Sequence, residues 1–448
     1  MLSLDESRAA VERLVERAVR AGADAADAAY VGSRSTEVDV RLGELEEVTR
    51  SEGEEIGLRL FVGSRSASVA SSDLSDEALG ELVKRARAMA AEAPEDPFAG
   101  LAPSDLLASG PFPELDAIDA TEPDPGRLRG RALAAEKSAL AVEGVSNSTG
   151  GSAGASDNVF ALATSAGFAG AYRGTGFSCS AGVIAGEGSA MQRDSAWHSA
   201  RHLADLDAPE EIGRLAGKRA VARLNPVRPK SGPLPVLFDP RVSSGLLGHL
   251  AGAISGSSVA RKSSFLQDRL GSKIFADGVT IVDDPLRARG LRSRPFDSEG
   301  LAVRKTAIIE NGALRTWMAE SASARQLGIG PTGHAARAVG SRPGVSPSNF
   351  YMEAGKRSRE ELLAAFPEAL LVTELIGHGV NGVTGDYSRG AFGFLVRNGE
   401  IGPAVQEITI ASNLLDMFAT LEPASDLEFR RGIDAPTILI PEMTVASG

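Results

Sequence analysis

The sequence predicts an α+β fold in which an N-terminal helix–sheet layer domain precedes a strand-rich, mixed α/β C-terminal domain. Three observations support this prediction. Helical periodicity and strand-like alternation follow each other in the first half. Short apolar runs joined by hairpin-type turns fill the second half. A proline-rich stretch over 225–235 separates the two patterns.

The chain begins with a helix-start pattern. Ser3 followed by Glu6 is typical of a capping box, in which each side chain accepts a hydrogen bond from the backbone of the other residue. Apolar residues then recur at helical spacing, which predicts an amphipathic helix over 5–21 that ends at Gly22. Alternation then predicts two strands, and helical spacing returns after them; these elements cover 37–42, 56–62 and about 75–92.

Prolines and small residues dominate the rest of the first half. Seven prolines over 93–126 preclude a regular helix, so this segment is predicted to be a surface linker or crossover. A helix follows over about 125–143. The Gly-, Ser- and Ala-rich stretch 144–205 is typical of successive antiparallel strands, and a helix over 209–224 ends this half.

The segment 225–235 is the predicted domain boundary. It contains four prolines, which favour a stiff and extended linker. We therefore expect an N-terminal α+β domain over 1–224, a linker over 225–235 and a C-terminal strand-rich domain over 236–448.

Cap and turn signals organise the second half. After a strand over 235–238, Asp239 and Pro240 fit the N-cap and first position of a helix that runs to about residue 256. A later helix begins near Ser358 and precedes a strand over 369–376. Two Asn-Gly dipeptides between apolar runs predict β-hairpins: Asn311-Gly312 and Asn398-Gly399.

Composition and charge narrow the class of protein. The 448 residues carry a formal net charge of −12. This argues against nucleic-acid binding, which needs clustered Lys and Arg. The sequence begins without a signal-peptide pattern, and no apolar run reaches the ~18 residues of a membrane span. We therefore expect a cytoplasmic protein with no membrane or nucleic-acid partner. The single cysteine, Cys179, is interpreted as a buried strand residue rather than a nucleophile.

The segment 377–393 is rich in Gly, Asn, Asp and Thr and lies between two apolar runs. Such a composition predicts a loop on a β scaffold, a usual place for function. Its polar members are His378, Asn381, Asp386 and Arg389. Two interpretations stay open. Asn and Asp can satisfy loop backbone groups through Asx turns, or the loop can border a peptide channel.

Several motifs together resemble one protein family. They include Gly377 to Asn381, Thr384 to Ala391, Glu407 to Ala411, Arg261 to Leu266, Val282 to Pro285, Phe296 to Gly300 and Ile309 to Leu314. The sequence resembles the PmbA/TldE branch of the TldD/TldE metalloprotease family, also labelled modulators of DNA gyrase. The resemblance is dense over 230–448 and looser before it.

The resemblance implies a PmbA/TldD-type fold and a role as one subunit of a cytoplasmic zinc metalloprotease complex. The partner would be a TldD-type, zinc-bearing subunit, and the substrates would be peptides and unfolded proteins. A homodimer is expected when that partner is absent.

Metalloproteases of this family carry His-Glu-x-x-x-His on a helix, where two imidazoles bind zinc and the Glu acts as general base. The resemblance matches those three positions to Leu247, Gly248 and Gly252. His249 has neither a following Glu nor a second His within a turn, so it is interpreted as structural or as lining an interface. The segment 429–436 lacks the late Cys ligand of the TldD branch. We expect no catalytic or metal-binding residue in this chain and zinc in its partner.

Glycine within the predicted ligand helix has a cost. Gly248 and Gly252 each destabilise a helix by roughly 1 kcal/mol relative to Ala, and close packing of another backbone would explain them. Together with the polar residues of the Gly-rich loop, this helix gives the candidates for a substrate channel or an interface: His249, Gly252, His378, Asn381, Asp386 and Arg389.

Other polar residues have mainly structural interpretations. His198 and His202 are spaced for a metal on a helix, but their alternating surroundings favour a strand, where they would lie roughly 13 Å apart. Asp283-Asp284 is interpreted as a strand end and turn, and His334 as a loop residue. No Walker loop or strand–GxGxxG–helix unit supports nucleotide binding.

Two alternatives to the complex subunit remain. One is a stand-alone peptide-binding or regulatory protein without hydrolytic activity. The other is an independent hydrolase with unusual ligands, for instance His198 or His202. A neighbouring gene that encodes His-Glu-x-x-x-His would favour the complex.

Overall fold

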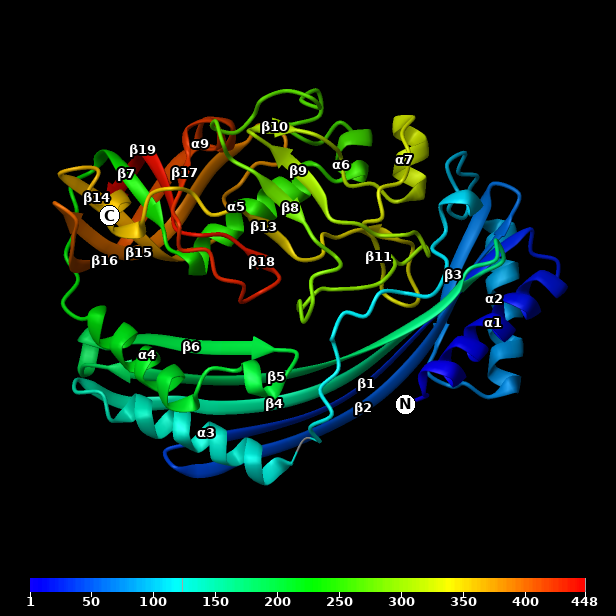
Figure 1. Cartoon of the computed structure of the whole chain (residues 1–448), viewed down its shortest axis with the longest axis horizontal. Coiled ribbons are helices and arrows are strands. Elements are labelled where there is room, and N and C mark those ends of the chain that lie inside the picture. Colours follow the sequence, from blue (N-terminus) through cyan, green and yellow to red (C-terminus); the bar gives the residue numbers. More distant parts are fainter. Residues whose placement is uncertain (123, 448) are drawn as a thin grey trace.

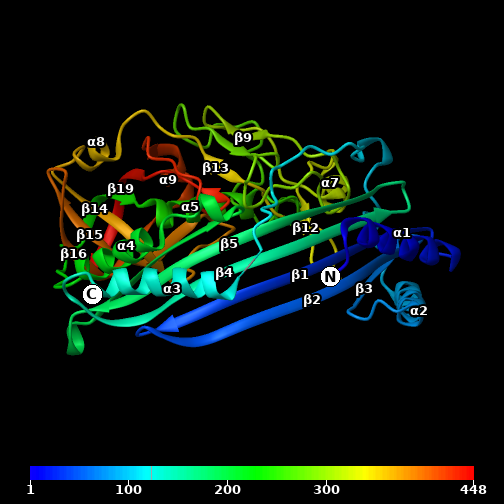
Figure 2. The same ribbon diagram turned by 60° about the horizontal axis from the view of Figure 1, so that its bottom comes forward.

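The computed structural model describes residues 1–122 and 124–447. The first half forms one six-stranded antiparallel sheet in the order β3-β2-β1-β4-β5-β6. Its long strands curve beneath the second half of the chain (Figures 1 and 2). The strands are β1 (Ala25–Arg41), β2 (Glu44–Val62), β3 (Arg65–Ser71), β4 (Val145–Thr164), β5 (Ala169–Ala185) and β6 (Gln192–Ala200).

Two pairs of helices cover one face of this sheet. Alternate positions of β1 divide between the faces, because successive strand side chains point in opposite directions. Tyr30 packs in the core beneath the first helix pair and Val38 in the core beneath the second. Ala29 packs on the other face, together with Phe296 of the second half. The helices are α1 (Leu4–Arg20), α2 (Asp76–Glu92), α3 (Pro125–Leu140) and α4 (Pro209–Ala222).

Local signals place these elements close to their predicted bounds. The Ser3 side chain accepts a hydrogen bond from the Glu6 backbone N–H at 3.3 Å, and Glu6 accepts one from the Ser3 N–H at 2.9 Å. This capping box begins α1 as predicted. Helices α3 and α4 end a few residues earlier than predicted, at Leu140 and Ala222. Among its described residues, the proline-rich segment 93–124 holds one short 3₁₀ turn, Ser104–Leu106.

Strand β2 is longer than the sequence indicated. The predicted strand 56–62 is only its buried end, whereas 44–53 is exposed throughout. This exposed part pairs with β1, and β3 pairs only with 56–62. Because neither face of 44–53 is buried, its sequence lacks the apolar alternation that reveals a strand.

The second half contains a small closed barrel. Its sheet has the order β16-β15-β14-β7-β19-β17, and an additional pairing between β16 and β19 closes five of these strands into a ring. The strands are β7 (Gly232–Phe238), β14 (Glu368–Ile376), β15 (Asp386–Arg397), β16 (Glu400–Asn413), β17 (Glu422–Pro423) and β19 (Ile438–Ser447).

Smaller sheets and short helices surround the barrel. A five-stranded sheet has the order β10-β9-β8-β13-β18, and β11 pairs with β12. These strands are β8 (Ile281–Asp283), β9 (Thr306–Glu310), β10 (Ala313–Leu314), β11 (Ala335–Ala336), β12 (Gly344–Val345), β13 (Phe350–Met352) and β18 (Ile433–Asp434). The helices are α5 (Pro240–Ala253), α6 (Gly256–Ala260), α7 (Ser321–Leu327), α8 (Arg359–Leu363) and α9 (Leu414–Thr420).

Both Asn-Gly hairpins are confirmed. Asn311 and Gly312 have φ values of 48° and 80°, and the turn joins β9 to β10. Asn398 and Gly399, at 49° and 86°, join β15 to β16. Positive φ at both positions is the requirement of the tight turn that Asn-Gly favours.

The predicted boundary needs two local corrections. Strand β7 begins at Gly232 rather than 235, so it overlaps the predicted linker. Its prolines are tolerated because β7 pairs with β14 only from Val236 onward and has one neighbour, β19, before that. The helix predicted to reach 256 ends at Ala253, and α6 begins at Gly256. The division into two domains stays a prediction.

A buried ion cluster joins the two halves. Asp27 of β1 accepts hydrogen bonds from Arg59 of β2 and, at 2.5 Å, from Arg337 in the second half. The Asp27 and Arg337 side chains are each 1% exposed.

In the part of the chain that the structure describes, no helix is long and apolar enough to cross a membrane.

Candidate functional site

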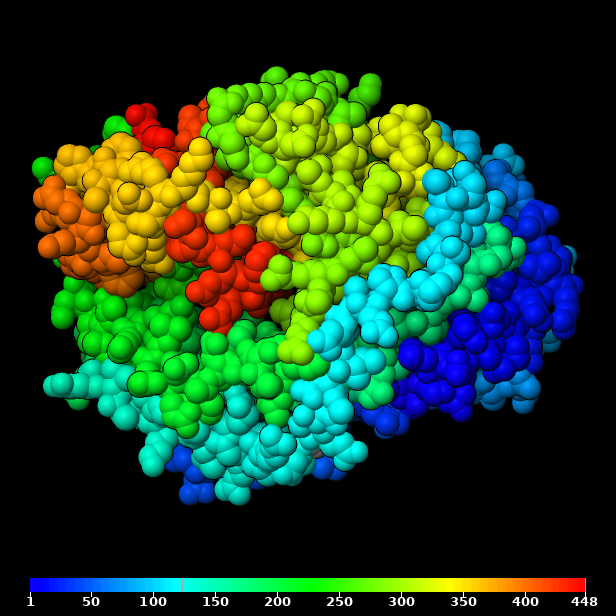
Figure 3. Space-filling model, viewed as in Figure 1, coloured from blue at the N-terminus to red at the C-terminus, as the bar shows by residue number. Residues whose placement is uncertain are grey.

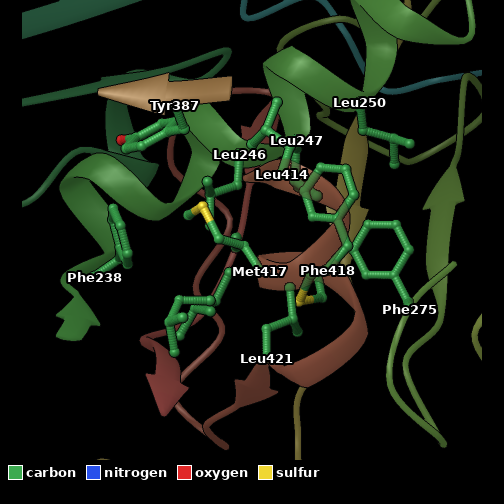
Figure 4. Close-up of a cluster of buried hydrophobic side chains, with 14 of the residues drawn as sticks. Phe238, Leu246, Leu247, Leu250, Phe275, Tyr387, Leu414, Met417, Phe418 and Leu421 are labelled. Carbon is green, nitrogen blue, oxygen red and sulfur yellow. The ribbon is translucent and has the colours of Figure 1, made fainter. Parts of the chain in front are cut away.

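Helix α5 is the helix that the sequence analysis matched to the ligand helix of the family. Asp239 caps it by accepting a hydrogen bond from the Arg241 backbone N–H at 3.1 Å, and Pro240 occupies the first turn, as predicted. The inner face of α5 packs its leucines against α9 and Tyr387 in the main core of the second half (Figure 4). Because this face is buried in the core, the opposite face of α5 lies at the surface.

The outer face of α5 is a stripe of glycines. Gly245, Gly248 and Gly252 are exposed, and a Cβ built on any of them would meet no heavy atom within 4 Å. Leu247, the other position matched to the zinc motif, is buried in the core. No second backbone of this chain packs on the stripe, so the close packing expected at Gly248 and Gly252 is not made within the described residues.

His249 lies between this stripe and the Gly-rich loop. Its ring stands edge-on to the Tyr387 ring at a centroid distance of 6.0 Å. Burial, followed by the charge of Arg389, lowers the pKa of His249, which favours a neutral imidazole. The structure thus brings together His249, Tyr387 and Arg389 from two separate elements.

Tyr387 was not singled out from the sequence, where it lies within the predicted loop 377–393. That loop ends earlier than predicted, because β15 begins at Asp386 and includes Tyr387. Tyr387 is 2% exposed, and its hydroxyl has no hydrogen-bond partner among the described residues. Burial is also the main reason that its pKa is raised above the usual value.

The loop that precedes β15 is held by its own side chains. The Asn381 carboxamide oxygen accepts hydrogen bonds from the N–H groups of Val383 at 2.9 Å and Thr384 at 3.3 Å. Asp386 accepts one from the Thr384 hydroxyl at 2.6 Å and one from Asn413 at 3.2 Å. Thr384 and then Asn413 lower the pKa of Asp386. Asn381 therefore makes the backbone contacts of the first interpretation, whereas Asp386 binds side chains.

The remaining loop candidates face outward. His378 is exposed and Arg389 is half-buried. Gly379 is required by a close approach, since a Cβ there would lie 1.9 Å from the Ser388 carbonyl oxygen. Ile376 and Val383, 50% and 58% exposed, add apolar surface to the loop. We call residues 376–384, Asp386, Ser388 and Arg389, together with Gly245, Gly248, His249 and Gly252, the α5/loop surface.

His198 and His202 do not form a pair. His198 lies on β6, as the strand interpretation predicted, and its ring accepts a hydrogen bond from the Asp207 N–H at 3.1 Å. His202 follows the strand and contacts the Asp116 carbonyl oxygen at 2.9 Å. Burial lowers the pKa of His198. Each imidazole thus contacts a different loop of the first half, His198 at Asp207 and His202 at Asp116.

Asp283 and His334 lie in the second half's core. Asp283 accepts hydrogen bonds from the Ser348 N–H at 2.6 Å and from its hydroxyl at 2.8 Å. His334 is 2% exposed, contacts the Thr332 hydroxyl at 2.8 Å and lies 3.4 Å from Asp283. Asp284 accepts the Leu286 N–H at 3.1 Å. Among the described residues, no group of three or more His, Cys, Asp or Glu side chains is arranged to hold a metal ion.

A second candidate site is a cavity of about 1010 Å³ between β6 and α4 on one side and the second half on the other. Figure 3 shows the surface hollowed between the green β6–α4 segment and the red C-terminal segment. Arginines from both halves line it, notably Arg219, Arg241 and Arg431. The cavity could not be predicted from the sequence, because these residues are scattered along the chain and only Arg430 and Arg431 are adjacent.

Models of three domains of one protein family match the chain. The C-terminal domain of PmbA/TldA metallopeptidases matches residues 231–447, the central domain matches 113–224 and domain 1 matches 26–90. The metalloprotease PmbA of Escherichia coli O157:H7 is 39% identical over 448 residues, covering 99% of this chain and 97% of the relative. The chain belongs to the PmbA/TldD metallopeptidase family.

Other family members are similar over nearly their whole length. A PmbA homolog of Haemophilus influenzae is 38% identical, covering 98% of this chain and 96% of its own. A crystal structure of a candidate modulator of DNA gyrase from Bacteroides thetaiotaomicron superposes with a TM-score of 0.92 at 26% identity, covering 100% of both chains. TldE of Thermococcus kodakarensis has the same fold, with a TM-score of 0.87 at 24% identity and coverage of 98% and 100%. The predicted PmbA/TldD-type α+β fold is thereby confirmed.

Proposed function

We propose that this PmbA/TldD family member is the TldE/PmbA-type, non-catalytic subunit of a cytoplasmic zinc metalloprotease complex. Its partner would be a TldD-type subunit that holds the zinc, and the complex would cleave peptides and unfolded proteins. The observation that carries the proposal is which residues occupy the matched positions of α5. At the positions that the resemblance matches to the two zinc-binding histidines and the glutamate, this helix has Leu247 in the core and Gly248 and Gly252 on its outer face.

The α5/loop surface supports a partner contact. Exposed glycines on a helix let another backbone approach closely, and Ile376 and Val383 add apolar area beside them. An obligate interface through this surface would bury roughly 2,000 Å² or more in total. Without the TldD-type partner, the same surface is expected to support a homodimer, because related subunits share that geometry.

The proposal predicts different activities for the isolated chain and for the pair. After chelator washing and dialysis, the purified chain should retain no stoichiometric zinc and should leave an unfolded protein uncut. Mixed with an equimolar TldD-type subunit, it should support proteolysis that a chelator abolishes. Elemental analysis and gel-based cleavage provide the two readouts. About one zinc per isolated chain, or cleavage without the partner, would contradict the proposal.

The Gly252→Leu variant tests the surface. The leucine should weaken assembly strongly, because it projects from the helix face on which the partner would pack. The fold should be retained, since space is open at Gly252 and Leu favours helix over Gly by roughly 0.8 kcal/mol. Light scattering measures assembly, and circular dichroism measures folding.

Gly130 provides a matched control for that variant. It is an exposed glycine on α3, also with nothing within 4 Å of a built Cβ, and it lies in the other half of the chain. Gly130→Leu should assemble like the parent chain. Equal loss of assembly in both variants, or none in Gly252→Leu, would remove the α5/loop surface from the proposal.

A stand-alone peptide-binding protein is the second candidate. The cavity between the two halves favours it, since that cavity is formed by this chain alone. A chain that is monomeric at micromolar concentration and does not bind a TldD-type subunit would make this the better proposal.

A further inference from the structure

The cavity between the halves contains two arginines without an ionic partner. Arg219 of α4 and Arg431, which precedes β18, both line it. Neither forms an ion pair with any described carboxylate. Arg219 donates one hydrogen bond, to the Ser195 carbonyl oxygen at 3.2 Å, and Arg431 donates one to the Pro240 carbonyl oxygen at 3.2 Å. Each guanidinium has five N–H groups, so most of its donors remain available.

Most acidic residues of the cavity are already paired with arginines other than Arg219 and Arg431 or with backbone N–H groups. Asp194 pairs with Arg223 and Arg241, both within 3.5 Å. Asp239 pairs with Arg241 and Arg359. The other occupied carboxylates bind Arg430, Arg223 or backbone N–H groups; they are Asp207, Glu428, Glu374, Asp426 and Asp434. Glu211, on the exposed side of α4, is the remaining acidic lining residue.

Arg219 and Arg431 therefore bring positive charge into the cavity from opposite sides, one from α4 and the other from the second half. Burial, followed by repulsion from Arg241, lowers the pKa of Arg219 to about 10. Burial also lowers the pKa of Arg431; the charges of Asp434 and Asp239 oppose this shift, and Arg241 and Arg430 add to it. Guanidinium groups stay charged at neutral pH even so. An anion between them would relieve this repulsion and accept charge-assisted hydrogen bonds.

Apolar side chains lie beside the arginines. Trp197 of β6 is 47% exposed, and the Arg431 guanidinium carbon lies 5.3 Å from its ring centroid. Leu215 of α4 is 44% exposed on the same cavity. Exposed large apolar residues in a concave, charged site are typical of a surface that binds a ligand with both characters.

We propose that this cavity binds the C-terminal carboxylate of a peptide, with Arg219 and Arg431 donating to the carboxylate and Trp197 and Leu215 contacting the terminal apolar side chain. The carboxylate site rests on the residues of this cavity. That its natural ligand is a peptide rests on the proposed function. The site requires no partner subunit, so it is tested on the isolated chain.

Trp197 supplies a direct readout. The chain has two tryptophans, and Trp317 is 5% exposed, so a Trp317→Phe background leaves the cavity residue as the fluorophore. Three N-acetylated tripeptides serve as probes: one ending in leucine with a free carboxylate, its C-terminal amide, and an amidated peptide with a central glutamate. The free acid should change Trp197 fluorescence saturably and bind about tenfold or more tightly than either amide.

The three probes separate the possible sources of the carboxylate. Equal binding of the free acid and its amide, or no binding of any probe at millimolar concentration, would overturn the proposal. Equal binding of the free acid and the glutamate peptide would overturn the assignment to a chain terminus in favour of acidic side chains. Because no TldD-type subunit is present, these results are independent of whether the complex forms.

Variants in the same background test the arginines. Arg219→Gln and Arg431→Gln should each weaken binding of the free acid about tenfold and leave amide binding unchanged. Arg214→Gln is the matched control, because Arg214 is an exposed arginine of the same helix whose side chain, among the described residues, bonds only the Glu210 carbonyl oxygen. A similar loss in Arg214→Gln would indicate general electrostatics and overturn the site. Thermal melts verify folding, and Arg219→Gln keeps the test decisive if Arg431→Gln unfolds.

Discussion

Replacing Asp27 with asparagine should lower the free energy of unfolding by about 3–5 kcal/mol, because it leaves buried guanidinium charge without compensation. Asp27 sits between Arg59 of the first half and Arg337 of the second. Two nitrogens of Arg337, Nε and Nη2, have no partner among the described residues, so Asp27 is its main compensation. Urea unfolding followed by circular dichroism measures the loss.

The pKa of Asp27 is consistent with this role. Burial alone would raise it, but Arg337 and Arg59 outweigh burial and lower the pKa, so the carboxylate stays charged. An asparagine of the same shape keeps the packing and removes the charge. The loss should therefore be electrostatic rather than steric.

An exposed pair gives the control for this variant. Asp157 accepts two hydrogen bonds from Arg173, at 2.7 and 2.8 Å, but the two side chains are 22% and 42% exposed. Asp157→Asn should cost less than about 1 kcal/mol, since water compensates the lost contact. Equal losses in the two variants would show that the buried cluster does not hold the halves together.

The sequence predicted the elements whose signals are local. The caps at Ser3 and Asp239 act within three residues, and each Asn-Gly turn needs only its own two dihedral pairs. The capping box at Ser358, which begins α8, is of the same kind. These features depend on neighbours in sequence, so no tertiary information was needed.

Other parts of the fold depend on contacts distant in sequence. The barrel closes through pairs such as Ile410 with Val445, and nothing in either strand specifies that partner. The buried Asp27 and Arg59 lie opposite each other on β1 and β2. In the sequence, Arg59 resembles a solvent-facing residue of the predicted strand 56–62, and Asp27 precedes the predicted strand 37–42, although β1 begins at Ala25. Their burial appears only when the second half covers that face.

The candidate sites also combine features that are local in sequence with features that depend on distant contacts. The Gly-rich segment 377–393 and the helix that the resemblance matches to the ligand helix were visible because each is contiguous in sequence. The cavity arginines were not, since Arg219 and Arg431 are brought together only by the packing of one half on the other. The edge-on contact of His249 with Tyr387 likewise joins a helix to a distant strand.

Raising the pH should selectively destabilise the wild-type chain relative to a Glu299→Gln variant. Glu299 is 3% exposed, and burial, followed by the charge of Asp297, raises its pKa from an ordinary 4.5 to about 7. Its carboxylate accepts hydrogen bonds from the Ser321 N–H at 2.8 Å and hydroxyl at 2.7 Å and lies 3.9 Å from Arg59. These contacts offset only part of the burial cost.

The direction follows from proton binding. Below pH 4.5 the folded and unfolded chains both hold the Glu299 proton, and its contribution to stability is fully present. Between pH 4.5 and 7 the unfolded chain releases the proton while the folded chain keeps it, so stability falls as pH rises. At 1.36 kcal/mol per pKa unit, the wild type should lose about 3 kcal/mol relative to the variant between pH 4 and 8.

Comparison with the variant reports on Glu299 and its coupled neighbour Asp297, because the other carboxylates common to both chains largely cancel. The difference in the free energy of unfolding, measured by urea titration at several pH values, should change steeply near pH 5–7 and level off above the Glu299 pKa. Glu12→Gln, an exposed substitution on α1, should give a curve parallel to the wild type. Since Glu299 belongs to the second half and Arg59 to the first, the pH dependence reports on the docking of the halves that encloses the arginine cavity. Parallel curves for wild type and Glu299→Gln would show that this carboxyl group ionises alike in the folded and unfolded chains.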